Sequence, residues 1–371
     1  MNELGQNGGQ LIGEGVYGCA FDPPLICKEK NGKGAKKAKK AKKVLKQGEH
    51  VGKIAVIDDT QSEYKTSLFL KKIPNAEKYF ILIDDLCTPL PRSEQIEKDL
   101  KKCKAIENKS LEAFAQVTMP FGGKPLSAIH ISTSNIDLWQ FGKHLLEAGS
   151  LMLLHGIVHF DLHQGNILMN TRTTGRLIDF GLAWKPDELS LVNVPLLYRT
   201  FNPAINQEPP EVSVMNGILD GTSTVEADIK FTIQKKRAIV LYSNLFQIPP
   251  QTLDKELYDF ISGSWSFVKK HWYSFYKLYW TKMDSWAIGI NILSLYNDLL
   301  HDREFLISDS YLEKKSTMEN VIRHLCFMNA ASRWDCLEAL AVWAPDSPLL
   351  EKVDAIRWLE LKKEERLALK A

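Results

Sequence analysis

Four polar side chains interrupt two apolar stretches in the middle of the chain and limit how those stretches can fold. The stretch "VHFDLHQGNILM", residues 158–169, holds Asp161, His163 and Asn166 where a buried strand would carry only Val, Ile or Leu. Thirteen residues after Asn166, "IDFGLA" places Asp179 at a β-like turn. Mg²⁺ takes carboxylate and amide oxygens, together with waters and phosphates. Turn capping explains one of these residues but not the set, so the pattern favours a site for a metal and phosphates.

A glycine-rich hairpin predicted near the N-terminus also suits an anion. In "GEGVYGCA", Gly13, Gly15 and Gly18 lie between two β-like runs, whereas a dinucleotide-binding fold needs a helix there. Backbone N–H groups of glycine approach an anion closely because no Cβ intervenes. Further on, Lys53 in "VGKIAV" can point at phosphates if Glu63 on the next helix orients it. The alternatives are an ordinary glycine-rich hairpin and a solvated strand lysine.

The change of pattern along the chain predicts two lobes of different class. Residues 1–119 contain short β-like runs and one helix candidate over residues 61–73, with a polar insertion at 84–110. Residues 120–371 are mainly helical, and an insertion at about 212–280 carries dense aromatic residues that we interpret as core. We therefore expect an α+β fold with a small antiparallel β-sheet lobe and a larger, mainly helical lobe.

Two segments predict helices with particular features. In the polar insertion, Ile96, Leu100, Cys103 and Ile106 fall on one helical face. In the second lobe, residues 135–156 begin with an Asn, show helical apolar spacing and end with a Gly. We expect that Asn to be the N-cap and the Gly to close the helix.

Composition excludes some classes of protein. The formal charge is +2, from 47 basic and 45 acidic residues, so no overall field attracts nucleic acid or a membrane. No run of 18 apolar residues and no secretory leader is present, so we expect a soluble cytosolic monomer without a membrane partner. Six cysteines lack a C-x-x-C pair, and we predict free thiols. Residues 33–46 carry eight lysines in fourteen positions, either a solvated segment or a docking arm for acidic proteins or nucleic acid.

Together these motifs resemble the eukaryotic-type protein kinase family. "GEGVYGCA", "VGKIA", "HFDLHQGN" and "DFG" follow the order and spacing of its Gly-rich loop, strand lysine, catalytic loop and D-F-G triplet. "EPPEV", "MDSWAIG" and "NAASRWDCLEAL" are similar to its A-P-E, D-x-W-x-x-G and terminal arginine segments. The resemblance covers roughly residues 8–345 and implies a bilobal protein-kinase-like fold.

The resemblance implies a role for each matched residue of the catalytic motifs. Asp161 would accept or orient the proton of a substrate hydroxyl, and Asn166 and Asp179 would hold Mg²⁺ on ATP. Lys53, paired with Glu63, would grip the α and β phosphates, and the glycines of the hairpin would lie over them.

Other matched residues would bind adenine or hold the large lobe together. Adenine would lie against the backbone of "MPFGG", where Met119 guards the pocket, Pro120 offers its carbonyl and Gly122 its N–H. In the large lobe, Glu211 would form a buried ion pair with Arg333. Asp284 would brace the backbone of the catalytic loop.

The chain departs from the family pattern at four places. Phe160 replaces the arginine of the catalytic loop, which predicts activity without phosphorylation of the activation segment. His163 replaces a lysine and would donate a hydrogen bond to the transferring phosphoryl group, or alternatively only pack against the loop. Ser67 stands where a bulky apolar residue is expected after Glu63, which questions the helix register. The fourth departure is the length of the insertion at about 212–280.

The leading function is an ATP- and Mg²⁺-dependent kinase that phosphorylates Ser or Thr of protein substrates. "EGVYGCAFDPPLICK", "VGKI", "YFILI" and "MPFGG" further resemble serine/threonine kinases of large nucleocytoplasmic DNA viruses, which implies the host cytoplasm and leaves packaging in the virus particle open. A small-molecule or lipid phosphotransferase shares the catalytic loop and is one alternative. A pseudokinase scaffold, suggested by Phe160 and His163, is the other.

Overall fold

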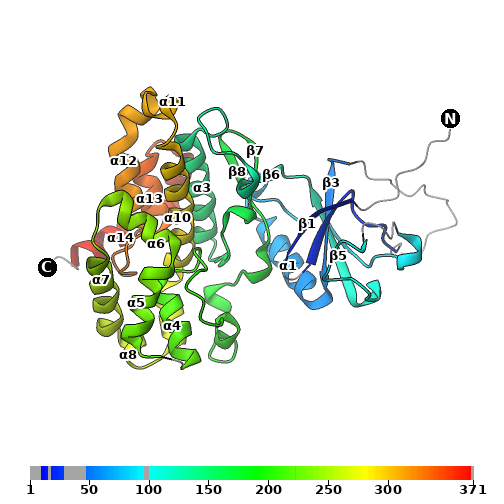
Figure 1. Ribbon diagram of the computed structural model, residues 1–371, viewed down its shortest axis with the longest axis horizontal. Coiled ribbons are helices and arrows are strands. Elements are labelled where there is room, and N and C mark those ends of the chain that lie inside the picture. Colours follow the sequence, from blue (N-terminus) through cyan, green and yellow to red (C-terminus); the bar gives the residue numbers. More distant parts are fainter. Residues whose placement is uncertain (1–9, 16–17, 29–46, 96–99, 222, 369–371) are drawn as a thin grey trace. The chain divides into compact units, whose positions relative to one another are not determined.

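A computed structural model of the chain describes residues 10–15, 18–28, 47–95, 100–221 and 223–368 (Figure 1). The chain divides into two compact units. The first runs to Gly123 and includes Ile178–Gly181, and the second holds the rest. Our expected division after residue 119 lies four residues before Gly123. It also leaves Ile178–Gly181 out of the first unit. The last strand of the first unit continues through Pro120, and Asp179 contacts Lys53 of the first unit.

The first unit is built on an antiparallel sheet, as expected. Its strands, in sheet order, are β1 (Gln10–Glu14), β2 (Gly18–Asp22), β3 (His50–Val56), β5 (Phe114–Pro120) and β4 (Asp85–Cys87). In the central strand β3, Ile54 is fully buried while the neighbouring Lys53 points to the other face, because side chains alternate along a strand. Lys53 is thereby fixed to a rigid sheet by pairing on both sides, with Ala20 and with Val117.

Helix α1 (Ile57–Leu70) follows β3 directly and packs against β3 and β5. We predicted this helix over residues 61–73, and its start was wrong by four residues. Asp58 and Asp59 lie in its first turn, where negative side chains interact favourably with the helix dipole, so Glu63 is not its only acidic residue. The helix ends before Pro74.

The insertion of the first unit folds onto the sheet. Leu100, Cys103 and Ile106 are fully buried and share a core cluster with Phe21 and Ile54 of the sheet. These apolar residues pack together as one face, but residues 101–109 form turns and not the predicted helix, and Ile96 lies outside the described residues.

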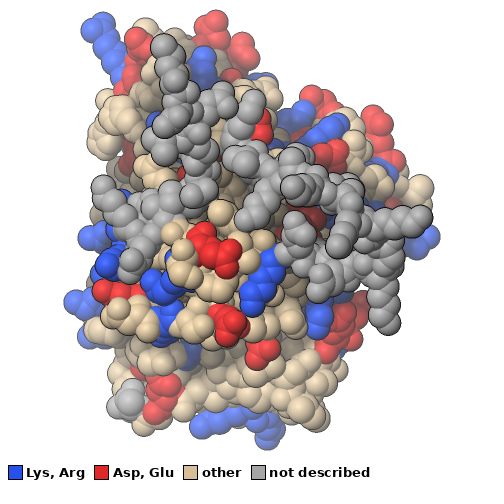
Figure 2. Space-filling view, turned by 90° about the vertical axis from the view of Figure 1, so that its right-hand side faces the viewer, with Lys and Arg blue, Asp and Glu red and all other residues tan. Residues whose placement is uncertain are grey.

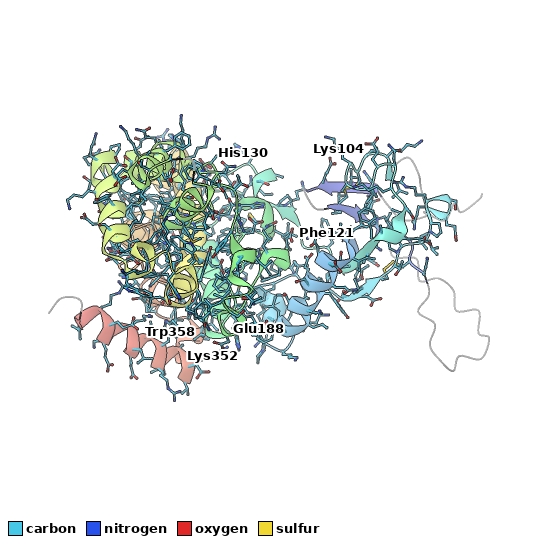
Figure 3. All side chains as sticks on the ribbon, turned by 90° about the horizontal axis from the view of Figure 1, so that it is seen from below. Lys104, Phe121, His130, Glu188, Lys352 and Trp358 are labelled. Carbon is cyan, nitrogen blue, oxygen red and sulfur yellow. A yellow bond between two sulfur atoms is a disulfide. The ribbon has the colours of Figure 1, made fainter. Side chains whose placement is uncertain are left out.

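Our prediction of free thiols is wrong for four of the six cysteines. Disulfide bonds join Cys19 to Cys103 and Cys27 to Cys87, and one is visible as a yellow bond in Figure 3. The pairs are 84 and 60 residues apart, so a test for local C-x-x-C spacing does not detect them. Cys326 and Cys336 are free and buried.

The second unit is mainly helical, as expected. Its larger helices are α3 (Leu138–Leu154), α4 (Pro210–Asp220), α5 (Val225–Lys235), α6 (Arg237–Phe246), α7 (Pro250–Gly263), α9 (Trp272–Tyr279), α10 (Met283–Leu299), α12 (Asp309–Leu325), α13 (Cys336–Trp343) and α14 (Val353–Ala368). Short helices α8 (Trp265–Val268) and α11 (Arg303–Leu306) lie between them. A small antiparallel sheet joins β6 (Lys124–Pro125), which precedes the catalytic loop, to β7 (Ile167–Thr171) and β8 (Thr174–Leu177), which follow it.

Two details of the second unit can be compared with the sequence. The predicted Asn cap of α3 is wrong, since Asp137 caps the helix by accepting from Gln140 N, while Asn135 binds the carbonyl of His130. Gly156 closes the helix in the left-handed conformation, as expected.

The aromatic residues of the insertion at 212–280 form core, as we interpreted. Phe275 and Tyr276 are fully buried, and edge-to-face contacts link Phe267, Trp272 and Phe275. Trp265 is an exception and is 59% exposed.

The C-terminal helix α14 is attached by polar contacts. Trp358, labelled in Figure 3, donates to Asp335 Oδ2 at 2.9 Å, and Arg366 pairs with Glu338 at 3.0 Å. In the described ranges, no helix combines the length and apolar character that a bilayer span requires. On the face drawn in Figure 2, acidic and basic side chains are interspersed. The lysine-rich segment 33–46 lies outside the described residues.

Candidate active site

In the first unit, Lys53, Glu63 and Asp179 form a cluster of one cation and two carboxylates. Lys53 Nζ donates to Glu63 Oε2 at 2.8 Å and to Asp179 Oδ1 at 2.6 Å. Burial opposes the charged ammonium, but the two carboxylates outweigh it and raise the pKa of Lys53. The lysine is therefore held as a fixed positive charge at neutral pH. The side chain of Asp179 is 39% exposed, so a ligand can reach its carboxylate.

The register of helix α1 supports this cluster. Ser67, one turn after Glu63, is buried, and its hydroxyl accepts a hydrogen bond from Ile83 N at 2.8 Å. A serine here thus satisfies a buried backbone donor, which an apolar side chain could not do. Ser67 therefore does not displace Glu63 from Lys53.

Asp179 has a backbone conformation that non-glycine residues rarely adopt. Its φ is 63°, in the left-handed region. The next residue, Phe180, is buried and packs edge-on against Phe80 with ring centroids 5.6 Å apart. Such conformations persist where surrounding contacts enforce them, and they cluster at functional sites.

The three glycines of the hairpin differ in what the fold requires of them. A Cβ on Gly18 would lie 2.0 Å from the carbonyl oxygen of Ile54, so the sheet admits only glycine there. At Gly13 and Gly15, a Cβ would meet only ordinary contacts of 3.7 Å or more. Packing therefore explains why residue 18 is a glycine. It does not explain Gly13 and Gly15, where the lack of a side chain would let a ligand approach the backbone closely. Residues 16–17 at the tip lie outside the described residues.

The predicted adenine-binding residues lie at the end of β5 and just after it. Met119 pairs with Val51 of β3 and is buried, whereas Pro120 is exposed. Gly122 is buried and precedes Gly123, which has a φ of 105°. The contacts of adenine with Met119, Pro120 and Gly122 stay a prediction.

In the second unit, Asp284 of α10 holds the backbone of the catalytic loop through two hydrogen bonds. His159 N and Phe160 N donate to the two carboxylate oxygens of Asp284 at 2.7 and 2.9 Å. This confirms that Asp284 braces the loop backbone. Burial raises the pKa of Asp284, while His159 and the two backbone donors act in the opposite direction. Asn291 of the same helix donates to the carbonyl of Leu162 at 3.0 Å.

The carboxylate of Asp161 contacts two side chains. Gln207 Nε2 donates to Asp161 Oδ1 at 2.9 Å, and His163 Nε2 lies 3.9 Å from Asp161 Oδ2. Asn166 Nδ2 donates to the Asp161 carbonyl at 2.9 Å, which turns the amide oxygen of Asn166 away from that bond. The structure thus brings Asp161, His163 and Asn166 together within one loop.

Glycine 165 explains the orientation of His163. Gly165 N donates to His163 Nδ1 at 3.0 Å, so the neutral ring carries its proton on Nε2, the nitrogen nearer Asp161. A Cβ on Gly165 would lie 2.7 Å from His163 Cε1. Only glycine therefore lets the ring fold back onto the loop. We did not single out Gly165 from the sequence, although its place between His163 and Asn166 was visible.

At Phe160, a cation approaches from the activation segment, residues 182–207, which lie between the D-F-G triplet and "EPPEV". The guanidinium of Arg199 lies 4.6 Å from the Phe160 ring centroid, and Arg199 Nη2 donates to the Phe160 carbonyl at 3.0 Å. Phe160 also packs edge-on against Trp184 and Tyr276. Sequence reasoning missed Arg199 and Gln207, because no fixed spacing links them to the catalytic loop.

The expected ion pair between Glu211 and Arg333 is confirmed. Both side chains are fully buried, and the two hydrogen bonds measure 2.8 and 2.9 Å. Arg333 Nε donates to the carbonyl of Phe327, and Nη1 also donates to that of Lys282. The charge is thus neutralised and its donors are satisfied, which a buried pair requires.

The residues available for a divalent cation are oxygen donors. Asp179 of the first unit has a carboxylate and Asn166 of the second unit an amide oxygen, both of a donor type that Mg²⁺ takes, and a cation shared by the two stays a prediction. Among the described residues, no group of three His, Cys, Asp or Glu side chains could hold a metal by itself.

Comparison with known protein families gives one match. The model of the ABC1 atypical kinase-like domain matches residues 117–194, which is less than half of the chain. The matched range includes Asp161, Asn166 and Asp179 but not Lys53 or Glu211. No curated protein matches the chain. The match over this range and the mixed α/β fold are consistent with a kinase-like fold, and they leave the substrate open.

Proposed function

We propose that the protein transfers the γ-phosphoryl group of ATP to serine or threonine hydroxyls of proteins. The observation that supports this most directly is the cluster in which Lys53 is held between Glu63 and Asp179. A lysine fixed and charged in this way suits the phosphates of a nucleotide. The exposed carboxylate of Asp179 suits a divalent cation that accompanies ATP.

Asn166 and Asp179 would hold Mg²⁺. When bound, the cation neutralises charge on the phosphate oxygens. The protein's own part is to fix Lys53 through β3 and Glu63, to keep the Asp179 carboxylate exposed, and to orient the Asn166 amide through the Asp161 carbonyl. Gly13 and Gly15, which packing does not explain, would allow the hairpin backbone to approach the phosphates.

Asp161 would act on the acceptor. A new bond forms between the hydroxyl oxygen and phosphorus, the bond from phosphorus to ADP breaks, and the hydroxyl proton passes to Asp161. Gln207 holds one oxygen of this carboxylate and leaves the other toward His163. The Nε2–H of His163 is the donor that would reach the transferring phosphoryl group.

Two features favour protein substrates over small molecules. The pair of Glu211 and Arg333 and the brace from Asp284 belong to motifs that resemble protein kinases and lie outside the range matched by the ABC1 model. That match instead favours the second candidate, a small-molecule phosphotransferase. The serine/threonine preference and the resemblance to kinases of large DNA viruses rest on sequence motifs. A scaffold without activity lacks a chemical cause, since Lys53, Glu63, Asp161, Asn166 and Asp179 are present.

The test is transfer of radiolabel from [γ-³²P]ATP with Mg²⁺ to a mixture of generic proteins, followed by phosphoamino-acid analysis. We expect labelled phosphoserine or phosphothreonine. Asp161→Asn should reduce the rate about 10²- to 10⁴-fold, the usual contribution of a positioned acid or base. Label appearing only in small molecules or lipids added to the reaction would favour the second candidate. Equal label with native protein and Asp161→Asn would exclude this site.

A further inference from the structure

A pocket of about 640 Å³ opens in the second unit beside the catalytic loop. It is formed by the catalytic loop, the activation segment, α10 and α6, the last of which belongs to the insertion at 212–280. The residues that matter here are His163, Gln164, Asn206, Gln207, Arg237 and Ser294. The insertion therefore contributes one wall of a pocket next to the proposed catalytic residues.

The pocket adjoins the Asp161 carboxylate through two of its lining residues. Gln207 donates to one oxygen of Asp161 at 2.9 Å, and His163 lies 3.9 Å from the other. A group bound in the pocket is thus separated from Asp161 by about one side chain. In a polypeptide substrate, such a group belongs to a residue close in sequence to the acceptor hydroxyl.

The charge in this pocket has one sign. Arg237, the first residue of α6, is exposed, and its side chain has no hydrogen bond or ion pair to any residue in the described ranges. The described residues that line the pocket include no Asp or Glu. The neutral lining residues are partly paired with one another, since Gln164 Nε2 donates to Ser294 Oγ at 3.3 Å. Arg237 is therefore a cation directed to the pocket without a counter-charge.

The walls of the pocket are held in place by hydrogen bonds. Asn206 Oδ1 accepts from Ala238 N at 3.0 Å, which ties the activation segment to the first turn of α6. The carbonyl of Asn206 accepts from Trp286 Nε1 at 2.9 Å, and that of Ile205 accepts from Lys236 Nζ. Because the walls are fixed before a ligand binds, less ordering of the protein opposes binding.

We infer that this pocket binds an acidic side chain of the protein substrate, located a few residues from the phosphorylated Ser or Thr, through Arg237. The inference rests on the proposed function and names its substrate class. A guanidinium forms paired hydrogen bonds with a carboxylate and suits this task better than an amide or hydroxyl. A hydrogen bond to a charged group changes kcat/KM by roughly tenfold to a hundredfold.

The test is a peptide library in which every position around a central Ser or Thr is varied in turn, phosphorylated by native protein and by Arg237→Glu. We expect the native protein to prefer Asp or Glu at one position, and Arg237→Glu to prefer Lys or Arg at the same position. Arg357→Glu, which changes an exposed arginine of α14, makes the same change in net charge and should behave as native. Glu at the first turn of a helix is compatible with folding, and a gained preference cannot come from misfolding.

Two results separate this inference from the proposed function. Peptides phosphorylated without an acidic preference, or with a preference that Arg237→Glu leaves unchanged, would overturn the inference alone. If native protein phosphorylates no peptide and no protein while transferring phosphate to a small molecule, the proposed substrate class fails, and the inference fails with it.

Discussion

Two lysines, Lys53 in the first unit and Lys236 in the second, differ in how their charge is stabilised. Lys53 contacts two carboxylates directly, and its pKa is raised although burial opposes this. Lys236 is fully buried and donates to the carbonyl of Ile205, but it forms no ion pair within the described part of the chain. Burial lowers the pKa of Lys236 to about 8, although Glu208 and Glu211, which form no hydrogen bond with it, act in the opposite direction.

Lys53 is therefore suited to binding a ligand, whereas Lys236 is suited to holding the activation segment in place. Lys53 stays charged and lies beside a half-exposed carboxylate, so a ligand can reach the cluster. Lys236 is closed off and fixes the activation segment next to Gln207, where a neutral amine can also donate. We therefore expect the two lysines to respond differently to substitution and to pH.

The largest expected effect comes from removing the cation of the first cluster. Lys53→Met should reduce phosphotransfer about 10²- to 10³-fold, which is typical of losing one preorganised electrostatic contact. Steady-state kinetics with ATP measure this. Lys65→Met, an exposed position on the same helix as Glu63, is the control and should retain the native rate. A Lys53→Met protein with native kcat/KM for ATP would remove Lys53 from the site.

The next effect concerns Lys236 and stability. Below pH 8, the folded and unfolded chains both keep the proton on Lys236. Between pH 8 and 10.5 the unfolded chain holds more protons, so the free energy of unfolding rises with pH. The rise is about 3 kcal/mol at most, because each pKa unit between the folded and the unfolded chain corresponds to about 1.36 kcal/mol. Urea unfolding at pH 7 to 10 should show this rise in the native protein and its loss in Lys236→Met. Equal slopes in the two proteins would contradict the lowered pKa.

A smaller effect should make Lys53 more like Lys236. Glu63→Gln removes one of the two contacting carboxylates, so burial weighs more and the pKa of Lys53 falls. We expect kcat/KM to fall roughly tenfold, and its alkaline decline to begin at lower pH than in the native protein. The pH profile of kcat/KM between 7 and 10 measures both. An unchanged profile would show that Asp179 alone sets the charge of Lys53.

The smallest expected effect is that of dephosphorylation, which should not change the rate of phosphotransfer. Lys236 and Arg199 hold the activation segment without a phosphate group, through the carbonyl of Ile205 and through Phe160. Treatment with a phosphatase should therefore leave the rate unchanged within about twofold, whereas Arg199→Ala should lower it several-fold. The treated and untreated native enzymes are compared by mass spectrometry and initial rate. Loss of activity on dephosphorylation would contradict the brace.

The sequence predicts contacts where residues belong to motifs with fixed spacing. The ion pair of Glu211 and Arg333 and the brace from Asp284 follow from such motifs, as does the approach of Glu63 to Lys53. The division into a sheet unit and a helical unit follows from the change of apolar periodicity, and the fold agrees with it.

Other contacts depend on how loops fold and have no pattern in the sequence. Gln207 reaches Asp161 across 46 residues, and Arg199 reaches Phe160 across 39. The disulfides join residues that only the folded insertion brings together. The start of α1 was missed because the helix begins directly after a strand, without the loop that usually marks a helix start.

The most direct test measures ATP binding and phosphotransfer separately. We predict that Asp161→Asn binds a fluorescent ATP analogue with Mg²⁺ as tightly as the native protein, within about twofold, and loses transfer. Asp179→Asn should lose the Mg²⁺-dependent part of binding, roughly tenfold or more in Kd, and transfer with it. Native Mg²⁺-dependent binding in Asp179→Asn, or equal loss of binding in both variants, would contradict the assignment of nucleotide to Lys53 and Asp179 and of the acceptor to Asp161.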